Sequence, residues 1–216
     1  MARGIGRGVP ADYDKNVFIN CPFDDPYLQL FRALVFAVFE CGLNPRCAQE
    51  VYDAGQVRIE KIAALVRDCR WGIHDISRTD LNARKLPRFN MPLELGLFLG
   101  AGRFGTGQQR NKSCLVLDRE KFRYQEFISD IAGQDIAAHD NDPLRAIKAV
   151  RDWLAVSRAG MSKPAGAAAI GRRYARFSND LPAICAQAEL QPDELTFVEY
   201  ADMASTWLKK DLGGGA

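Results

Sequence analysis

The sequence predicts an α/β domain in which helices cover both faces of a parallel β-sheet. Short, almost continuous apolar runs, typical of strands buried on both faces, alternate with longer segments of helical periodicity. The chain has 216 residues, of which 47% are hydrophobic and 26% are charged. This length and this ordinary composition suit one such domain with a small appendage.

Three strand–helix units are predicted in the first half of the chain. The apolar run NVFINCPF is a buried strand that stops near Pro22, and in the helix that follows Asp25 is the expected N-cap and Pro26 the first residue. Helical periodicity also marks the segments GQVRIEKIAALVRDC and NMPLELGLFLGAG. The predicted strands are residues 16–23, 45–51 and 70–77, and the predicted helices are residues 25–42, 55–69 and 90–102.

The second half completes a five-stranded, flavodoxin-like doubly wound sheet. It supplies a buried strand at 112–118, a short helix at 125–133, a weak strand at 135–140 and a helix at 142–158. Two further helical patterns follow the small residues of GMSKPAGAAAIG. The predicted organisation is a flexible N-terminal segment (1–14), the α/β domain (15–160), a linker (161–170), a C-terminal helical extension (171–210) and a disordered tail (211–216).

Composition and charge exclude several classes of function. The net charge of +2 is too small to indicate nucleic acid as a partner. No apolar run reaches the roughly 18 residues that a membrane-spanning helix needs, and no apolar signal core follows the basic N-terminus. The six cysteines form no C-x-x-C pair and there are only two histidines, so we expect reduced thiols, no metal site and a cytoplasmic location.

Polar side chains follow the predicted strands where each strand ends. In a doubly wound sheet, ligands bind at the carboxyl ends of the strands. Asp24 and Ser77 also have the alternative role of capping a helix or turn. The candidate binding residues are Asn20, Cys21, Phe23 and Asp24 after the first strand, Asp75 and Ser77 after the third, and Asn90 at the start of the next helix.

Glu94 is the acidic residue of the segment RFNMPLELGLFLGAGRFG, which otherwise reads as buried. A buried carboxylate is costly unless it is paired or hydrogen-bonded, and burial raises its pKa. Glu94 therefore either stabilises the start of a helix through the helix dipole or faces a cavity in which a carboxylate has a chemical role. A glycine-rich phosphate loop is not found after the first strand, because CPFDDP contains no glycine and GAGRFGTG follows a predicted helix.

The Glu94 segment carries a family resemblance. RFNMPLELGLFLG resembles the R-x-N-V-x-x-E-L-G motif of bacterial TIR-like nucleotide-binding domains, and it is similar to the E-L-G-Y-A segment of nucleoside 2-deoxyribosyltransferases. VFINCPFDD and CRWGIHDIS fit the first and third strands of the same pattern. The resemblance covers about residues 16–117, although Asn20 and Cys21 stand where TIR proteins typically carry Ser or Gly.

This resemblance implies chemistry on an N-glycosidic bond, with Glu94 as the key carboxylate. It also implies that Asp75 holds a ribose hydroxyl or the base, and that Asn90 fixes the glutamate or the ribose. The expected ligand is a nucleoside, a nucleotide or NAD as substrate, with no separate cofactor; Phe18, Phe23 or Trp71 are candidates for stacking on the base. Bacterial relatives with this motif act as antiphage effectors and commonly assemble, so a homo-oligomer is expected. The alternative is a nucleotide-sensing module that signals through its C-terminal helices without turnover.

Overall fold

The computed structural model describes residues 12–50, 53, 55–79, 88–158 and 163–213, and it contains one five-stranded sheet with all neighbouring strands parallel. The strand order is β2-β1-β3-β4-β5, which confirms the predicted flavodoxin-like α/β fold. The chain reverses its direction of winding between β1 and β3, which lie side by side. The strands are β1 (Asn16–Asn20), β2 (Asn44–Arg46), β3 (Trp71–Asp75), β4 (Ser113–Asp118) and β5 (Ile136–Ala138).

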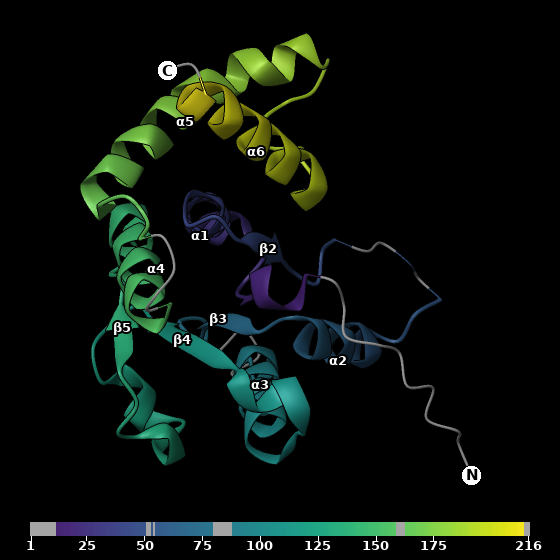
Figure 1. Ribbon diagram of the computed structural model, residues 1–216, viewed down its shortest axis with the longest axis vertical. Coiled ribbons are helices and arrows are strands. Elements are labelled where there is room, and N and C mark those ends of the chain that lie inside the picture. The colour runs from purple at the N-terminus through teal and green to yellow at the C-terminus, as the bar shows by residue number, and fades with distance from the viewer. Residues whose placement is uncertain (1–11, 51–52, 54, 80–87, 159–162, 214–216) are drawn as a thin grey trace.

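Helices cover both faces of the sheet (Figure 1). Alternate residues of β1 explain the arrangement, because Val17 and Ile19 belong to the core under α1 and α4, whereas Phe18 packs with α2 and α3 on the other face. The helices of the α/β domain are α1 (Leu28–Glu40), α2 (Arg58–Asp68), α3 (Asn90–Phe104) and α4 (Pro143–Ser157). Short 3-10 helices lie at Tyr13–Lys15, Asp25–Tyr27, Gly107–Asn111, Arg123–Glu126 and Ser129–Ile131.

Several local predictions differ from the structure. Asp25 does not cap α1, because residues 25–27 first form a 3-10 turn and α1 begins at Leu28. The predicted helix at 125–133 is two 3-10 turns, and β2 ends at Arg46 instead of continuing to residue 51. The N-terminal prediction is wrong at Tyr13, which is buried and donates its hydroxyl to the Gln108 carbonyl at 2.9 Å, while residues 1–11 lie outside the described part.

A C-terminal extension of two helices, α5 (Ala167–Gln187) and α6 (Phe197–Gly213), packs over α1 on the side away from the sheet (Figure 1). Phe36 of α1 contacts Phe177 and Trp207, at ring-centroid distances of 5.5 and 6.2 Å. The helical extension covers more of the chain than predicted: α5 starts within the expected linker, since alanine is the best helix former and Ile170 is fully buried. Likewise α6 continues to Gly213 in the expected tail, of which residues 214–216 lie outside the described part.

Each helix in the described part of the chain is too short or too polar to cross a membrane. The longest, α5, carries charged residues along its exposed side.

Gly72 in the middle of β3 allows α3 to approach the sheet closely. A Cβ atom at this position would lie 2.7 Å from His74 Nε2 and 2.9 Å from Phe98 Cζ, both in buried side chains that cannot easily move. We therefore expect Gly72→Ala to lower the free energy of unfolding by about 1–3 kcal/mol through overpacking. Urea unfolding followed by circular dichroism checks this, with Gly96→Ala as the control, because the added Cβ there meets nothing within 4 Å. Equal stability of the two variants would contradict the prediction.

Candidate functional site

The sequence-predicted residues converge at the carboxyl ends of β1 and β3. The register pairs Asn20 with His74, so that Cys21 and Asp75 follow at the same edge of the sheet. The Asn20 amide donates to the Met91 carbonyl at 3.0 Å and lies 3.1 Å from His74 Nδ1. Asn20 is itself buried, and it therefore joins both strands to the first turn of α3. This places Glu94, one turn later in α3, beside the same edge.

His74 contributes an uncharged ring to the contact between β1, β3 and α3. Its side chain is fully buried, and its ring lies 5.6 Å from that of Phe18 and 4.9 Å from that of Phe98. Burial, with a smaller contribution from the positive charge of Lys112, lowers the pKa of His74 to about 3. His74 is thus a packing residue that carries no charge near neutral pH.

Glu94 is a buried carboxylate that does not cap the helix on which it lies. It is the fifth residue of α3, beyond the first turn in which an acidic side chain stabilises free backbone N–H groups. Only 7% of the residue is exposed, and among the described residues it pairs with the cation of Arg58, whose Nη2 atom is 4.0 Å from Glu94 Oε1. Burial raises the pKa of Glu94 to about 7, while the positive charge of Arg58 partly opposes the increase.

Cys21 lies among these carboxylates and is an unreactive thiol. Burial raises the pKa of Cys21 well above its usual range, and the charges of Asp75, Glu94 and Asp24 raise it further. Because the thiolate is the nucleophilic form, Cys21 is not a suitable nucleophile here.

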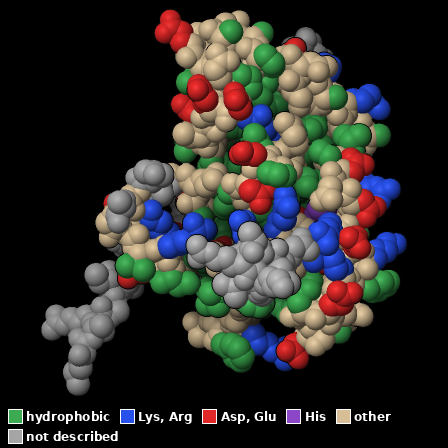
Figure 2. Space-filling view, turned by 180° about the vertical axis from the view of Figure 1, so that it is seen from behind, with side chains coloured by type: hydrophobic (Ala, Val, Ile, Leu, Met, Phe, Trp, Pro, Cys, Tyr) green, Lys and Arg blue, Asp and Glu red, His purple; other side chains and the backbone are tan. Residues whose placement is uncertain are grey.

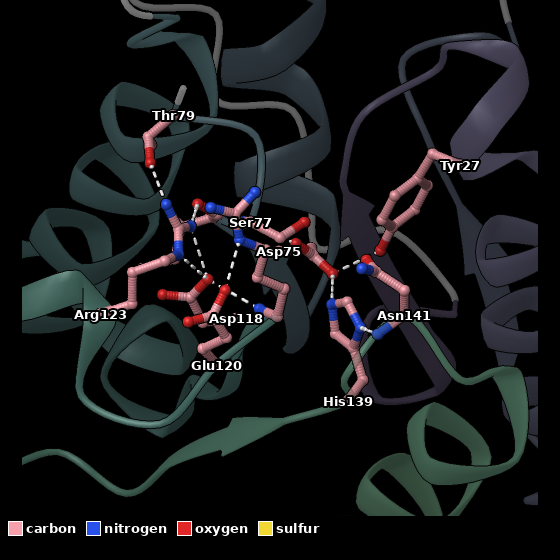
Figure 3. A network of polar contacts seen from close by, with 11 residues as sticks. Tyr27, Asp75, Ser77, Thr79, Asp118, Glu120, Arg123, His139 and Asn141 are labelled. Atoms are coloured by element: carbon pink, nitrogen blue, oxygen red, sulfur yellow. Dashed lines mark hydrogen bonds and ion pairs between the residues drawn. The ribbon is translucent and has the colours of Figure 1, made fainter. Parts of the chain in front are cut away.

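Asp75 organises a buried network behind the site (Figure 3). One oxygen, Oδ1, accepts the Ser77 backbone N–H at 2.8 Å, and the other, Oδ2, accepts the Tyr27 hydroxyl at 2.5 Å. Asp75 has no exposed surface and Tyr27 is almost fully buried. In this structure Asp75 therefore orients protein groups, and the predicted direct contact with a ribose or a base finds no open surface on it.

His139 completes the network from the end of β5. Its Nε2 atom lies 2.9 Å from Asp75 Oδ2, and its Nδ1 atom accepts the Asn141 backbone N–H at 3.0 Å. A neutral ring with Nδ1 as acceptor carries its proton on Nε2, the atom that faces Asp75. Asp140 and Asn141 have φ angles of +49° and +56°, so two consecutive left-handed residues hold this turn.

A second buried carboxylate, Asp118 at the end of β4, pairs with Arg123 (Figure 3). Arg123 Nη2 is 2.6 Å from Asp118 Oδ1, and the same guanidinium donates to the Thr79 hydroxyl and the Ile76 carbonyl, both at 3.0 Å. Burial raises the pKa of Asp118, although its bonds to Arg123 work in the opposite direction. The pair ties the polar segment after β3 to the end of β4.

Two arginine side chains form ion pairs with Asp24, which lies in the segment after β1. Arg78 Nη2 is 3.1 Å from Asp24 Oδ1 and Arg88 Nη1 is 3.6 Å from Oδ2, so the carboxylate bridges segments that follow β1 and β3 and precede α3. From behind the view of Figure 1, Lys and Arg side chains gather across the middle of the molecule on both sides of the grey atoms (Figure 2). Asp24, a predicted binding residue, therefore forms ion pairs with two arginines.

The remaining predicted residues divide into accessible and buried groups. Phe23 is half-buried with its ring 5.3 Å from that of Phe31, and Asn90 is exposed at the start of α3, one turn before Glu94. Phe18 and Trp71 are core residues with at most 2% exposure and have no surface for stacking on a base. Among the described residues, no group of three or more His, Cys, Asp or Glu side chains is arranged to hold a metal ion.

No protein-family model and no curated protein matches this chain.

Sequence reasoning missed Tyr27, His139, Asp118 and Arg123. Tyr27 and His139 lie 112 positions apart by their residue numbers, and only the sheet order brings both to Asp75. The available signal was the position of Asp118 and His139 at or near the carboxyl ends of predicted strands, which is the same rule that selected Asp75.

The raised pKa of Glu94 predicts an unusual effect on stability. Because the folded-state pKa of about 7 lies above the ordinary value of 4.5, the folded protein loses stability as the pH rises through this interval and does not regain it above. Glu94→Gln removes this cost, so at about pH 8 we expect the variant to be more stable than wild type by about 1–3 kcal/mol, with no difference near about pH 4.

Urea unfolding at the two pH values measures this difference. Glu60→Gln on the exposed side of α2 is the matched control and is expected to change little at either pH. A loss of stability in Glu94→Gln at high pH would instead support a helix-stabilising role for the carboxylate.

Proposed function

We propose that this protein cleaves or transfers an N-glycosidic bond of a nucleoside, a nucleotide or NAD, with Glu94 as the key carboxylate. The observation that carries the proposal is the position of Glu94 at the carboxyl edge of a parallel sheet. It is a buried acid beyond the first turn of its helix, and among the described residues its ion pair is with Arg58, at 4.0 Å. The motif resemblance around this residue supports the same chemistry.

The proposed reaction uses the charge of Glu94 at the sugar carbon. As the carbon–nitrogen bond breaks, the base leaves with the electron pair and the anomeric carbon becomes oxocarbenium-like. An ionised Glu94 stabilises that positive charge, and its shielding from water strengthens the interaction. Addition of water then gives the free sugar hydroxyl, while addition of another base completes a transfer; in each case the proton lost by the incoming group goes to the departed base or to solvent.

In this proposal the buried network supports the site without contacting the substrate. Asp75 holds Tyr27, Ser77 and His139 in fixed positions behind the end of β1, and Asn20 fixes the first turn of α3. The backbone that carries Cys21 and Glu94 is thereby held in place. Phe23 and Asn90 are the predicted residues with surface available for a ligand.

The experiment is a search for released base by mass spectrometry. The purified protein at high concentration is incubated with NAD and with a panel of nucleosides and nucleotides, beside the Glu94→Gln variant. A free base produced by wild type and not by the variant supports the proposal and names the substrate. If no compound yields a base at concentrations that allow assembly, the proposal fails.

Nucleotide sensing without turnover is the second candidate, and one structural link favours it. The ring of Phe31 in α1 lies 5.3 Å from that of Phe23 at the site and 5.9 Å from that of Phe197 at the start of α6. A ligand that moved Phe23 would therefore act on the C-terminal extension. Binding of a nucleotide without release of base, with altered assembly, would support this candidate.

A further inference from the structure

A pocket of about 480 Å³ lies beside the candidate site and is formed partly by the C-terminal extension. Its walls come from the segment after β2, from α2 and from the start of α6. This volume lies within the range of about 300–1,000 Å³ that is typical of ligand sites. The described lining residues are Ala48, Gln49, Gln56, Arg58, Lys61, Leu195, Thr196 and Phe197.

The polar lining of this pocket suits an anion. It contains the two cations Arg58 and Lys61 and the amides of Gln49 and Gln56, with no carboxylate among the described lining residues. Lys61 Nζ also donates to the Asp53 carbonyl at 2.8 Å, and an ammonium group has three N–H donors. Arg58 and Lys61 are three residues apart on α2, and residues at this spacing share one face of a helix. A planar guanidinium next to an ammonium group is a common arrangement for binding phosphate.

Arg58 connects this pocket to the candidate site. Its side chain is 65% exposed, it lines the pocket, and its guanidinium lies 4.0 Å from Glu94 Oε1. That distance is longer than a normal hydrogen bond. The guanidinium can therefore turn toward an anion in the pocket without breaking a close pair.

The start of α6 is held firmly as the opposite wall. Thr196 and Glu199 form a reciprocal cap, in which the Thr196 N–H donates to Glu199 Oε2 at 2.8 Å and the Glu199 N–H donates to Thr196 Oγ1 at 3.3 Å. Phe197 packs on Phe31 of α1, and the Tyr200 hydroxyl donates to the Arg32 carbonyl at 3.1 Å. The extension thus provides a fixed surface of the pocket.

We infer that this pocket binds the phosphate group of a nucleotide whose sugar lies at Glu94. The inference rests on the proposed function and makes it more specific, because it selects 5′-phosphorylated compounds over free nucleosides. Arg58 and Lys61 bind the phosphate oxygens, and Gln49 and Gln56 donate from the same pocket. In this arrangement the sugar lies at Glu94, and the phosphate lies in the pocket beyond it, at Arg58.

Binding measurements on the Glu94→Gln protein test this inference without requiring turnover. Isothermal titration compares adenosine, cytidine, guanosine and uridine with their 5′-monophosphates, and includes inorganic pyrophosphate. We expect at least one monophosphate to bind about tenfold or more tightly than its nucleoside, and we expect pyrophosphate to compete with it. The advantage is expected to fall as salt is added.

The double variant Arg58→Gln/Lys61→Gln, made in the same background, is expected to lose this advantage and to bind the nucleoside as before. Arg172→Gln, an exposed change on α5, is the matched control and is expected to retain it. Equal affinity for nucleosides and monophosphates, an advantage that survives in the double variant, or no binding of any monophosphate or of pyrophosphate would each overturn the inference. Because Glu94 is already replaced, these binding results can be interpreted whether or not the wild-type protein cleaves an N-glycosidic bond.

Discussion

Glu94→Gln is expected to lower kcat/KM for release of the base by about a hundredfold to a thousandfold, which is the typical loss when one group that stabilises transition-state charge is removed. The variant keeps the size and shape of the side chain, removes its charge and replaces one acceptor oxygen with an NH2 donor. The buried position of Glu94 makes this effect large, because little water is present to replace the missing charge. Single-turnover kinetics with the substrate identified by mass spectrometry measures it.

The pH profile separates this role from a structural one. With a pKa of about 7, Glu94 is only partly ionised in neutral solution, so kcat/KM of wild type should rise with pH and level off above about 7. The residual activity of Glu94→Gln should lack this step, and its dissociation constant for substrate should change little. Glu60→Gln, on the exposed side of α2, should behave as wild type. A variant with full kcat, or one that loses binding and turnover together, would contradict the assigned role.

Periodicity and apolar runs predicted the sheet and its helices because these patterns depend on local sequence. The strands at Asn16–Asn20 and Ser113–Asp118 are buried on both faces, and their sequences read as almost continuous apolar runs. The prediction was less accurate where tertiary packing decides the structure. Ala167–Ala169 read as a flexible segment, yet burial of Ile170 against the α1–α4 core draws them into α5.

The candidate site was predicted where a residue stands at or just after the carboxyl end of its strand. The strand-end rule selected Asn20, Cys21 and Asp75, and these residues do converge. It could not reveal that Asp75 is enclosed by Tyr27 and His139, since their approach depends on how α1 and β5 pack against the sheet. The rule also could not show that the C-terminal extension lines the pocket next to the site, because its position depends on α1 packing beneath α6.

Asp75→Ala is expected to lower the free energy of unfolding by about 3 kcal/mol or more. The change leaves the Tyr27 hydroxyl, the Ser77 N–H and the His139 ring facing a cavity in the protein interior, and an unsatisfied buried donor costs about 1–3 kcal/mol. Tyr27→Phe removes one donor and leaves the other two contacts of Asp75, so its cost should be smaller, about 1 kcal/mol. Urea unfolding followed by circular dichroism measures both.

Asp14→Ala is the matched control for this prediction. Asp14 likewise has a hydrogen-bonded partner, Arg70 at 2.9 Å, but its side chain is 73% exposed, and an exposed pair contributes about 1 kcal/mol or less. The contrast therefore isolates burial, because both substitutions remove one carboxylate. If Asp75→Ala is no more harmful than Asp14→Ala, the network does not hold the ends of β1, β3 and β5 together. In that case the positions of Cys21 and Glu94 must depend instead on the junction that Asn20 forms between β1, β3 and α3.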